Sequence, residues 1–528
     1  MHRFEGASFF CHNKEIEKRE QGDDMARENV LAKGQKETNR PIVLAAVMIS
    51  MFMTAVESTI VGTAMPSIVS DLGGFSMLSW VFSAYLLAQA ITVPIYGKMS
   101  DLFGRKLIFV IGVSLFLVGS FLSGFSQTMT QLIFFRIIQG LGAGAVQPIA
   151  TTIIGDIYTL EERAKIQGYL SSVWGISAVI GPLLGALFVQ IHWSWIFWIN
   201  LPLGLMAMMG ILSSLHEVFE KKKHEIDYLG SLLLFVMIIS VMLASLQGGT
   251  AWSWLSWQTG FLLFLFLLGF FFFFVQERKA KEPIIPLHIW KNRTITFANL
   301  ASLTTGGLLI GISSFLPTHL QGAMGYPPLI AGFALTAMSI GWPFASFFSG
   351  KMMIRYGFRT TSILGGGFLL LGSLFFLTLT AERGAVWAGL GSFFTGMGMG
   401  FSTTSFIVSI QSGVPWNLRG VATSTNLFMR TLGGTVGAAF LGGVLNTALA
   451  RYLYGQGLPE EKASALIKQV NELLDPEKRV KMAEDAVKLL QGGLEGALHG
   501  VYWGMLLLTL LSLLFILLLP KEGEKMKE

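Results

Sequence analysis

The ten residues GKMSDLFGRK at positions 97–106 recur in altered form as GKMMIRYGFR at positions 350–359. Both read Gly-Lys-Met, three variable residues, an aromatic residue, Gly, one variable residue and a basic residue, at an offset of 350 − 97 = 253 residues. Each copy follows a long apolar segment. A short loop that recurs after corresponding segments indicates two homologous halves, an arrangement that often encloses a site at the middle of a membrane.

The composition of the chain is that of a protein with many membrane-spanning helices. Of its 528 residues, 52% are hydrophobic and only 13% are charged. The apolar residues come in runs of about 20, the length that crosses a bilayer core. We expect all-α structure with helices at residues 42–65, 77–97, 107–125, 130–153, 166–190, 195–214, 229–247, 258–276, 296–320, 328–350, 360–380, 385–409, 421–446 and 498–519.

The basic residues predict the orientation of these helices. With the N-terminus inside, the inner tails and loops hold 28 of the 38 Lys and Arg residues. The first six outer loops hold one, Arg383, whereas the seven in the long last outer loop are exempt from the positive-inside rule. We therefore expect both termini in the cytoplasm of a multi-pass cell-membrane protein. The net charge of +6 then gives no reason to expect a nucleic-acid partner.

The predicted helices group into domains. An extracellular helical hairpin is expected at 451–497, with a helix start at Asp475-Pro476-Glu477 and a helix stop at Gly492-Gly493. The expected parts are a cytoplasmic tail at 1–40, a six-helix bundle at 41–215, two linking helices with cytoplasmic flanks at 216–293, a second six-helix bundle at 294–519 that includes the hairpin, and a cytoplasmic tail at 520–528.

The repeated loop and the motifs below make residues 41–519 resemble the fourteen-helix drug:proton antiporters of the major facilitator superfamily. The resemblance implies two six-helix bundles with two extra helices between them. It also implies proton-coupled efflux of amphiphilic organic compounds by alternating access, without a cofactor, by a protein that works as a monomer in the lipid bilayer. A lipid, siderophore or other specific metabolite is an alternative substrate for the same scaffold.

One carboxylate lies deep in a predicted helix. Glu57 is in the sequence TAVESTIV at positions 54–61. A charged side chain at this depth costs at least a few kcal/mol, so it needs a partner, a water-filled cavity or a proton. The family has an aspartate in this motif, which implies a role for Glu57 in proton coupling. A structural ion pair is the alternative interpretation.

Arg136 is the expected partner of Glu57. It lies in the fourth predicted helix, and both residues fall in the outer half of the membrane. A guanidinium stays charged and can hold a carboxylate ionised until the two separate. The resemblance also implies that this arginine takes part in proton transfer. Arg430, a second intramembrane cation, is expected to reach the interface or to bond to backbone carbonyls.

The loop that follows the second predicted helix is expected to form an inner gate. Its glycines, Gly97 and Gly104, allow close approach of backbone segments. Asp101 can cap a helix N-terminus or pair with Arg105, next to Lys106. Such a contact stabilises one conformation and must break in the other. In the second copy Ile354 replaces the acid, so a weaker contact or none is expected there.

The fifth predicted helix carries small residues around a proline. Gly181, Pro182 and Gly185 allow a kink and tight helix packing. Packing of this kind would suit any membrane bundle. In the resembled family the motif is associated with antiporters, which implies export.

Polar and aromatic residues in the N-terminal half are candidates for contact with the substrate, although each could instead bond to a neighbouring helix. Near an outer interface, His319 is expected to be mere polar cover. No zinc-protease, nucleotide-binding or paired-cysteine motif is present, so we expect neither catalysis nor a metal site. The candidates for the substrate cavity are Tyr85, Gln89, Gln139, Trp174 and Asn200, with Gln147 as a further polar group.

Overall fold

A computed structural model describes residues 38–73, 77–217, 227–247, 252, 255–456, 466, 473, 479–480 and 482–520. The helices of the first bundle and the linking pair are α2 (Arg40–Leu72), α3 (Leu78–Phe103), α4 (Arg105–Ser123), α5 (Met129–Ile157), α6 (Leu160–Val189), α7 (Trp195–Trp198), α8 (Asn200–Ser214), α9 (Tyr228–Gln247) and α10 (Trp257–Lys279). Those of the second bundle are α11 (Arg293–Thr318), α12 (Pro328–Leu377), α13 (Gly384–Ser412), α14 (Arg419–Gly455) and α17 (Glu484–Leu517).

Each of the fourteen ranges predicted from the sequence overlaps one of these helices. Among the described residues, 11 helical segments are long and apolar enough to cross a membrane. One of them covers two predicted spans, because Gly357 interrupts α12 with a φ of 82°. Two further helices, α6 and α9, overlap the two predicted spans that remain, 166–190 and 229–247. Dividing α12 and adding α6 and α9 gives 11 + 1 + 2 = 14 spans.

Several helix starts follow from local sequence. The Asn39 side chain accepts a hydrogen bond from the Ile42 amide at the start of α2. At the start of α6, Thr159 and Glu162 form a capping box, each side chain accepting from the other's amide. Such caps satisfy amides that have no partner within the helix.

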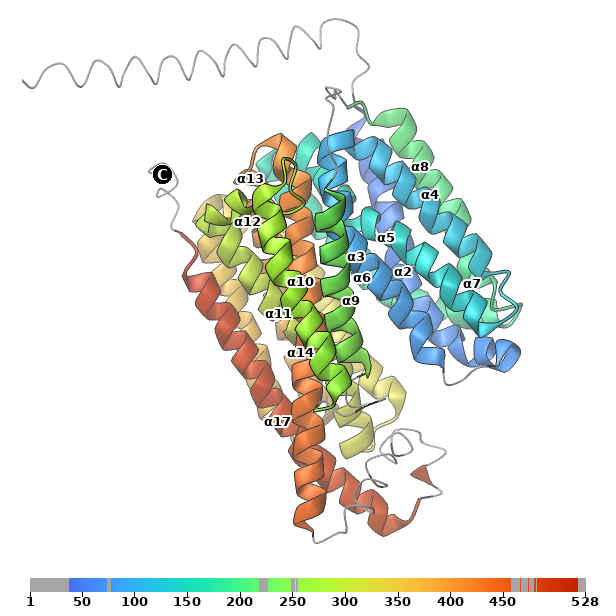
Figure 1. Cartoon of the computed structure of the whole chain (residues 1–528). Helices are drawn as coiled ribbons and strands as arrows, with labels where there is room; N and C mark the ends of the chain where they lie inside the picture. Colours follow the sequence, from blue (N-terminus) through green and yellow to red (C-terminus); the bar gives the residue numbers. More distant parts are fainter. Residues whose placement is uncertain are drawn as a thin grey trace, which may run out of the picture.

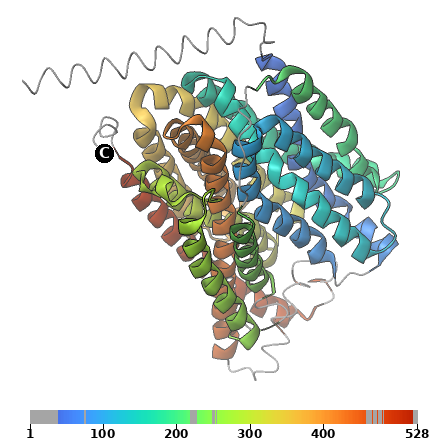
Figure 2. The same cartoon turned by 45° about the horizontal axis from the view of Figure 1, so that its top comes forward.

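The helices form two bundles with a pair of helices beside them (Figure 1). In the first bundle α2 packs on α6 and α8, and α5 packs on α3 and α4. In the second, α11 packs on α14 and α17, and the two parts of α12 pack on α13. The pair α9 and α10 lies against α3 and α14, on one side of the junction between the bundles, as both Figure 1 and Figure 2 show.

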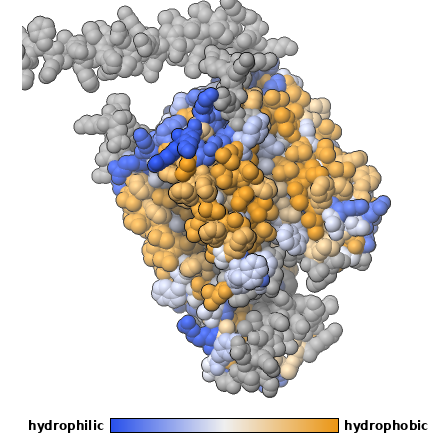
Figure 3. Space-filling view, viewed as in Figure 1, coloured by the Kyte–Doolittle hydropathy of each residue, from blue (hydrophilic) through white to orange (hydrophobic). Residues whose placement is uncertain are grey.

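An apolar surface surrounds the middle of the molecule. The space-filling view in Figure 3 shows hydrophobic residues across the middle of this face and hydrophilic residues near its top. Phenylalanines of α10 contribute strongly to it, since Phe264, Phe270 and Phe271 are each more than half exposed. This is the surface expected of a protein that faces lipid, and the all-α membrane fold predicted from the sequence is confirmed.

The helix stop predicted at Gly492-Gly493 is wrong. The helix α17 begins at Glu484 and continues through both glycines to Leu517. A Cβ atom at Gly493 would lie 2.7 Å from Cδ1 of Tyr452 in α14. These small residues therefore allow α14 and α17 to cross closely instead of ending a helix. The helix start predicted at Asp475-Pro476-Glu477 lies outside the described residues.

Candidate functional site

Glu57 in α2 is fully buried and lies at the centre of a polar cluster. Its carboxylate pairs with Nη1 of Arg136 in α5. It also accepts a hydrogen bond of 2.6 Å from Nδ2 of Asn200, the first residue of α8. Arg136 donates to Oε1 of Gln139, at 2.7 Å. The carboxylate of Glu57 and the guanidinium of Arg136 therefore neutralise each other, and the side-chain amides of Gln139 and Asn200 bond to them.

Ser120 connects the amides of this carboxylate cluster, which we define as Glu57, Arg136, Gln139, Asn200 and Ser120. The Ser120 hydroxyl accepts hydrogen bonds from Gln139 (3.1 Å) and Asn200 (2.9 Å) and donates to the carbonyl of Phe197 (2.8 Å). The sequence analysis missed Ser120, because a single serine in an apolar helix has no distinguishing pattern.

The ring of Tyr85 lies beneath the guanidinium of Arg136, 4.1 Å from its Cζ atom. A ring face in this position attracts the cation. Of the residues considered for the substrate cavity, Tyr85, Gln139 and Asn200 thus surround the buried ion pair. The sequence analysis left open whether they line a cavity or bond to a neighbouring helix, and in the structure Gln139 and Asn200 bond to residues of neighbouring helices.

A second polar cluster joins the two bundles at the end of the molecule where the described chain begins and ends, which we call the terminal face. Asp101, at the end of α3, accepts hydrogen bonds from the amides of Gly420 (3.0 Å) and Val421 (2.8 Å). These amides belong to the first turn of α14, where they have no partner within the helix. The carboxylate of one bundle therefore caps a helix of the other.

Arg105 extends this contact. Its guanidinium pairs with Asp101 at 2.7 Å and with Asp156, at the end of α5, at 2.9 Å. It donates to the carbonyl of Trp416 at 2.7 Å, and its Cζ atom lies 3.7 Å from the centre of a Trp416 ring. Arg419 donates to Asp156 from the other bundle, at 3.1 Å. Asp101, Arg105, Asp156, Trp416 and Arg419 together form the terminal-face cluster.

Four further hydrogen bonds lie at the terminal face. The amides of Arg105 and Lys106, at the start of α4, donate to the carboxylate of Glu217 at 2.9 and 3.1 Å. Lys106 donates to two carbonyls at the end of α8, those of Leu212 and Leu215. Gly104 makes this corner possible with a φ of 94°, a left-handed value that favours glycine.

The close approach of α3 and α14 depends on Gly97. A Cβ atom there would lie 1.9 Å from Oγ of Ser424 and 2.9 Å from the carbonyl oxygen of Gly420. Gln411 adds a hydrogen bond from the second bundle to the carbonyl of Thr151, at 3.2 Å. In the described part of the chain, every hydrogen bond and ion pair between the two bundles lies toward this face. The structure is therefore closed at the terminal face.

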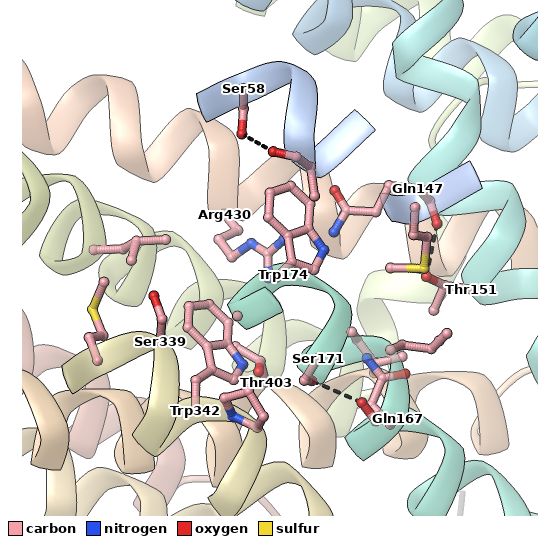
Figure 4. A pocket seen from close by; sticks show the side chains of 18 of the residues that line it. Ser58, Gln147, Thr151, Gln167, Ser171, Trp174, Ser339, Trp342, Thr403 and Arg430 are labelled. Carbon is pink, nitrogen blue, oxygen red and sulfur yellow. Dashed lines mark hydrogen bonds between the residues drawn. The ribbon is translucent and has the colours of Figure 1, made fainter. Parts of the chain in front are cut away.

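Between the bundles, further from the terminal face than this closure, lies a cavity of about 310 Å³, which we call the central cavity (Figure 4). Both bundles line it: Ser58, Thr59, Gln147, Gln167 and Trp174 come from the first, and Ser339, Trp342, Thr403 and Arg430 from the second. Trp174 lies in the cavity as the sequence suggested, and so does Gln147, whereas Gln89 is absent from the lining. The lining contains one charged side chain, Arg430.

The position of Arg430 differs from the expectation. Its side chain neither reaches an interface nor bonds to a carbonyl among the described residues, because it points into the central cavity. His319 also differs from the polar cover that was expected. It is fully buried, and its Nδ1 atom lies 2.8 Å from the hydroxyl of Tyr502.

The Gly181, Pro182 and Gly185 motif lies within α6, which runs from Leu160 to Val189. A Cβ atom at Gly181 would lie 1.9 Å from Oγ1 of Thr59 in α2. Thr59 lines the central cavity, so this close contact fixes the position of a cavity wall. Within the described residues no group of three His, Cys, Asp or Glu side chains could hold a metal ion.

Comparisons with known proteins agree with this architecture. The family model of the Major Facilitator Superfamily matches residues 47–227 and 208–438. The multidrug transporter protein MdtP of Bacillus subtilis is 35% identical over 532 residues, which cover 94% of this chain and 97% of that protein. Multidrug resistance protein 3 of the same organism is 38% identical over 410 residues, covering 78% of this chain and 80% of that protein.

A solved structure shows the same fold. The human organic anion transporter MFSD10 matches with a TM-score of 0.61 and 12% identity, covering 90% of this chain and 100% of that one. At this identity the likeness concerns the fold alone. With two regions matched by the family model and one bacterial relative aligned over 94% of the chain, the chain belongs to the Major Facilitator Superfamily and is a membrane transporter related to its multidrug transporters.

Proposed function

We propose that this transporter exports amphiphilic organic compounds across the cell membrane in exchange for protons, by alternating access. The observation that carries the proposal is the position of Glu57. It is fully buried, Arg136 is its one cationic partner among the described residues, and the next two residues of the same helix, Ser58 and Thr59, line the central cavity. A change in the charge of Glu57 therefore occurs one helix turn from the place where a substrate would bind.

The two charge states of Glu57 have different partners available. Ionised, the carboxylate neutralises Arg136 and accepts from Asn200, as in this structure. A proton on Glu57 removes the attraction to Arg136, so that Gln139 and the ring of Tyr85 remain as the contacts of the guanidinium. Protonation thus alters the packing among α2, α5 and α8, the elements that the cluster connects.

The terminal-face cluster supplies the second requirement, a gate. If this face is cytoplasmic, as the distribution of basic residues predicts, the structure is closed toward the cytoplasm. Opening on that side requires Asp101 to leave the first turn of α14, and Arg105 to separate from Trp416. The multidrug names of the relatives favour diverse organic substrates over a single lipid or siderophore.

Inside-out membrane vesicles with a pH-sensitive dye test this proposal. Drugs are added after a proton gradient is imposed, and the wild type is compared with Glu57→Gln and Glu57→Asp at matched expression. We expect drug-dependent proton release through the wild type, a decrease of at least tenfold in Glu57→Gln, and partial activity in Glu57→Asp. If Glu57→Gln releases protons as the wild type does, Glu57 is not the coupling site. If no drug moves protons through the wild type, proton-coupled drug export itself is refuted.

A further inference from the structure

Arg430 is a charged side chain without a counter-ion in the central cavity. Of the described residues that line the cavity, none is Asp or Glu. Within the described residues, the Arg430 side chain takes part in no hydrogen bond and no ion pair. Glu57, the buried acid of α2, is already paired with Arg136 and bonded to Asn200. The cavity therefore has a positive charge that no described residue neutralises.

A comparison with the fully buried Arg136 shows what Arg430, which is partly exposed to the cavity, lacks. Arg136 has a carboxylate, an amide oxygen and an aromatic face as partners. Arg430 has none of these, although it also lies between membrane-spanning helices. A guanidinium within the membrane-spanning part of a protein is costly without a partner, and such a cation is normally paired. A ligand with an anionic group can provide the partner that Arg430 lacks.

The other polar groups of the cavity also offer donors. The side-chain amides of Gln147 and Gln167 and the indole N–H groups of Trp174 and Trp342 line the cavity, and no hydrogen bond to another described residue occupies them. In contrast, the hydroxyls of Thr59 and Thr151 donate to backbone carbonyls. Free donors around an unpaired guanidinium suit an anionic group with several acceptor oxygens.

The remaining walls of the cavity are apolar or aromatic. Met51, Leu309, Met338 and Ile407 line it together with the rings of Trp174 and Trp342, which Figure 4 shows around the same space as Arg430. A volume of about 310 Å³ is at the lower end of the range of small-molecule pockets. The cavity therefore suits a compact compound with one anionic group and one hydrophobic ring system.

We propose that Arg430 is the substrate-anchoring residue of the central cavity and that the preferred substrates are amphiphilic organic monoanions, such as aromatic carboxylates or sulfonates. This inference rests on the proposed export function, because a compound that binds here is a substrate only if the protein exports it. The guanidinium binds the anionic group, the amides and indoles of the cavity orient it, and the methionines and tryptophans contact the hydrophobic part. A cation of the same shape meets the uncompensated charge of Arg430 and binds weakly.

Three naphthalene compounds that share a ring and differ in charge test the inference. They are naphthalene-1-sulfonate, neutral 1-naphthalenemethanol and the cation (1-naphthylmethyl)trimethylammonium, none of which changes charge near neutral pH. Their affinities for the purified full-length protein in detergent are measured by titration calorimetry. For the wild type we expect the sulfonate to bind at least tenfold more tightly than the cation. A wild type that binds none of the three, or that prefers the cation, overturns the proposal without the need for a variant.

Two variants then test whether Arg430 is responsible for the preference for the sulfonate. Arg430→Gln should weaken sulfonate binding at least tenfold and change naphthalenemethanol binding less than threefold, whereas Arg430→Lys, which keeps the charge, should retain much of the sulfonate preference. Unchanged sulfonate binding in Arg430→Gln overturns the assignment. The naphthalenemethanol affinity reports whether the cavity of a variant is intact.

This binding test is separate from the coupling test. Glu57→Gln should retain the sulfonate preference, since Glu57 does not line the cavity. Failure of proton release with an intact anion preference refutes the proposed coupling only. Intact proton release without an anion preference refutes only the role of Arg430.

Discussion

The two copies of the repeated turn have the same backbone and different chemistry. Gly104 and Gly357 occupy matching positions and both have a left-handed φ, 94° and 82°. In the first copy Asp101 caps α14 and pairs with Arg105, so the turn holds the two bundles together. In the second copy the matching residue is Ile354, which is 55% exposed. The first copy links the two bundles, whereas the described side-chain hydrogen bond of the second, from Arg359 to Leu517, stays within one bundle.

The difference shows that the repeat specifies the shape of the turn, whereas a single carboxylate makes the contact between the bundles. Both turns reverse the chain between neighbouring helices of a bundle, which requires only glycine at the corner. The contact between bundles requires an acceptor facing the unpaired amides of a helix start. Because only one copy has the acid, the terminal face is asymmetric, and variants at matching positions of the two copies should have unequal effects.

The largest effect is expected for Asp101→Asn. The substitution keeps the size of the side chain and removes the charge that binds two amides and Arg105. Hydrogen bonds to a charged group contribute about 1.5–3 kcal/mol each, so a loss of about 3 kcal/mol would shift the equilibrium between closed and open terminal faces roughly 100-fold. We expect drug efflux from cells to fall at least tenfold.

Ile354→Asn is the matched control for this prediction, because it places the same side chain at the corresponding position of the second copy. It should leave efflux within about twofold of the wild type, as is usual for exposed positions. Equal losses of efflux in the two variants, at equal expression, would contradict the assignment of the gate to the first copy alone.

A smaller difference is expected between Gly104→Ala and Gly357→Ala. A left-handed conformation costs a non-glycine residue about 1–2 kcal/mol, so both variants should unfold at lower temperature than the wild type. At Gly104 the new Cβ atom would also lie 2.9 Å from Oε2 of Glu217, which holds the first amides of α4. In detergent and at one scan rate, Gly104→Ala should therefore unfold at a lower temperature than Gly357→Ala. The opposite order would show that the corner at Glu217 is not tightly packed.

The smallest effect is expected for Arg359→Ala in the second copy. Nη2 of Arg359 donates to the carbonyl of Leu517, the last residue of α17, at 2.9 Å. A cation at an exposed helix end contributes about 0.3–1 kcal/mol. Efflux should stay within about twofold of the wild type, with a small decrease in unfolding temperature. A tenfold loss of efflux would show that the second copy also has a gating role.

The sequence was sufficient to predict the fold and the helix on which each predicted site residue lies. Hydropathy predicted the spans, the repeated loop predicted two halves, and the intramembrane charges singled out Glu57, Arg136 and Arg430. Helix positions were predictable because each depends on a run of apolar residues that is local in the chain.

Contacts between distant segments were not predictable in the same way. Asp156 and Trp416 meet Arg105, and Arg419 meets Asp156, only through the packing of distant segments, and nothing in their local sequence indicates these contacts. Tyr85, Gln139 and Asn200 could have faced either a cavity or an ion pair, since a polar residue in an apolar helix is compatible with both. The direction of Arg430 likewise depends on which face of α14 the second bundle leaves uncovered.

The central claim is that Asp101 closes the terminal face, and spin-label distances across that face test it most directly. In a Cys11→Ser background, which removes the one cysteine of the chain, labels are attached at Ser213→Cys in the first bundle and Arg355→Cys in the second, both exposed positions. The wild type and Ile354→Asn should show the same distance distribution, and Asp101→Asn should gain a population at longer distance. A distribution in Asp101→Asn that matches the wild type would contradict the claim.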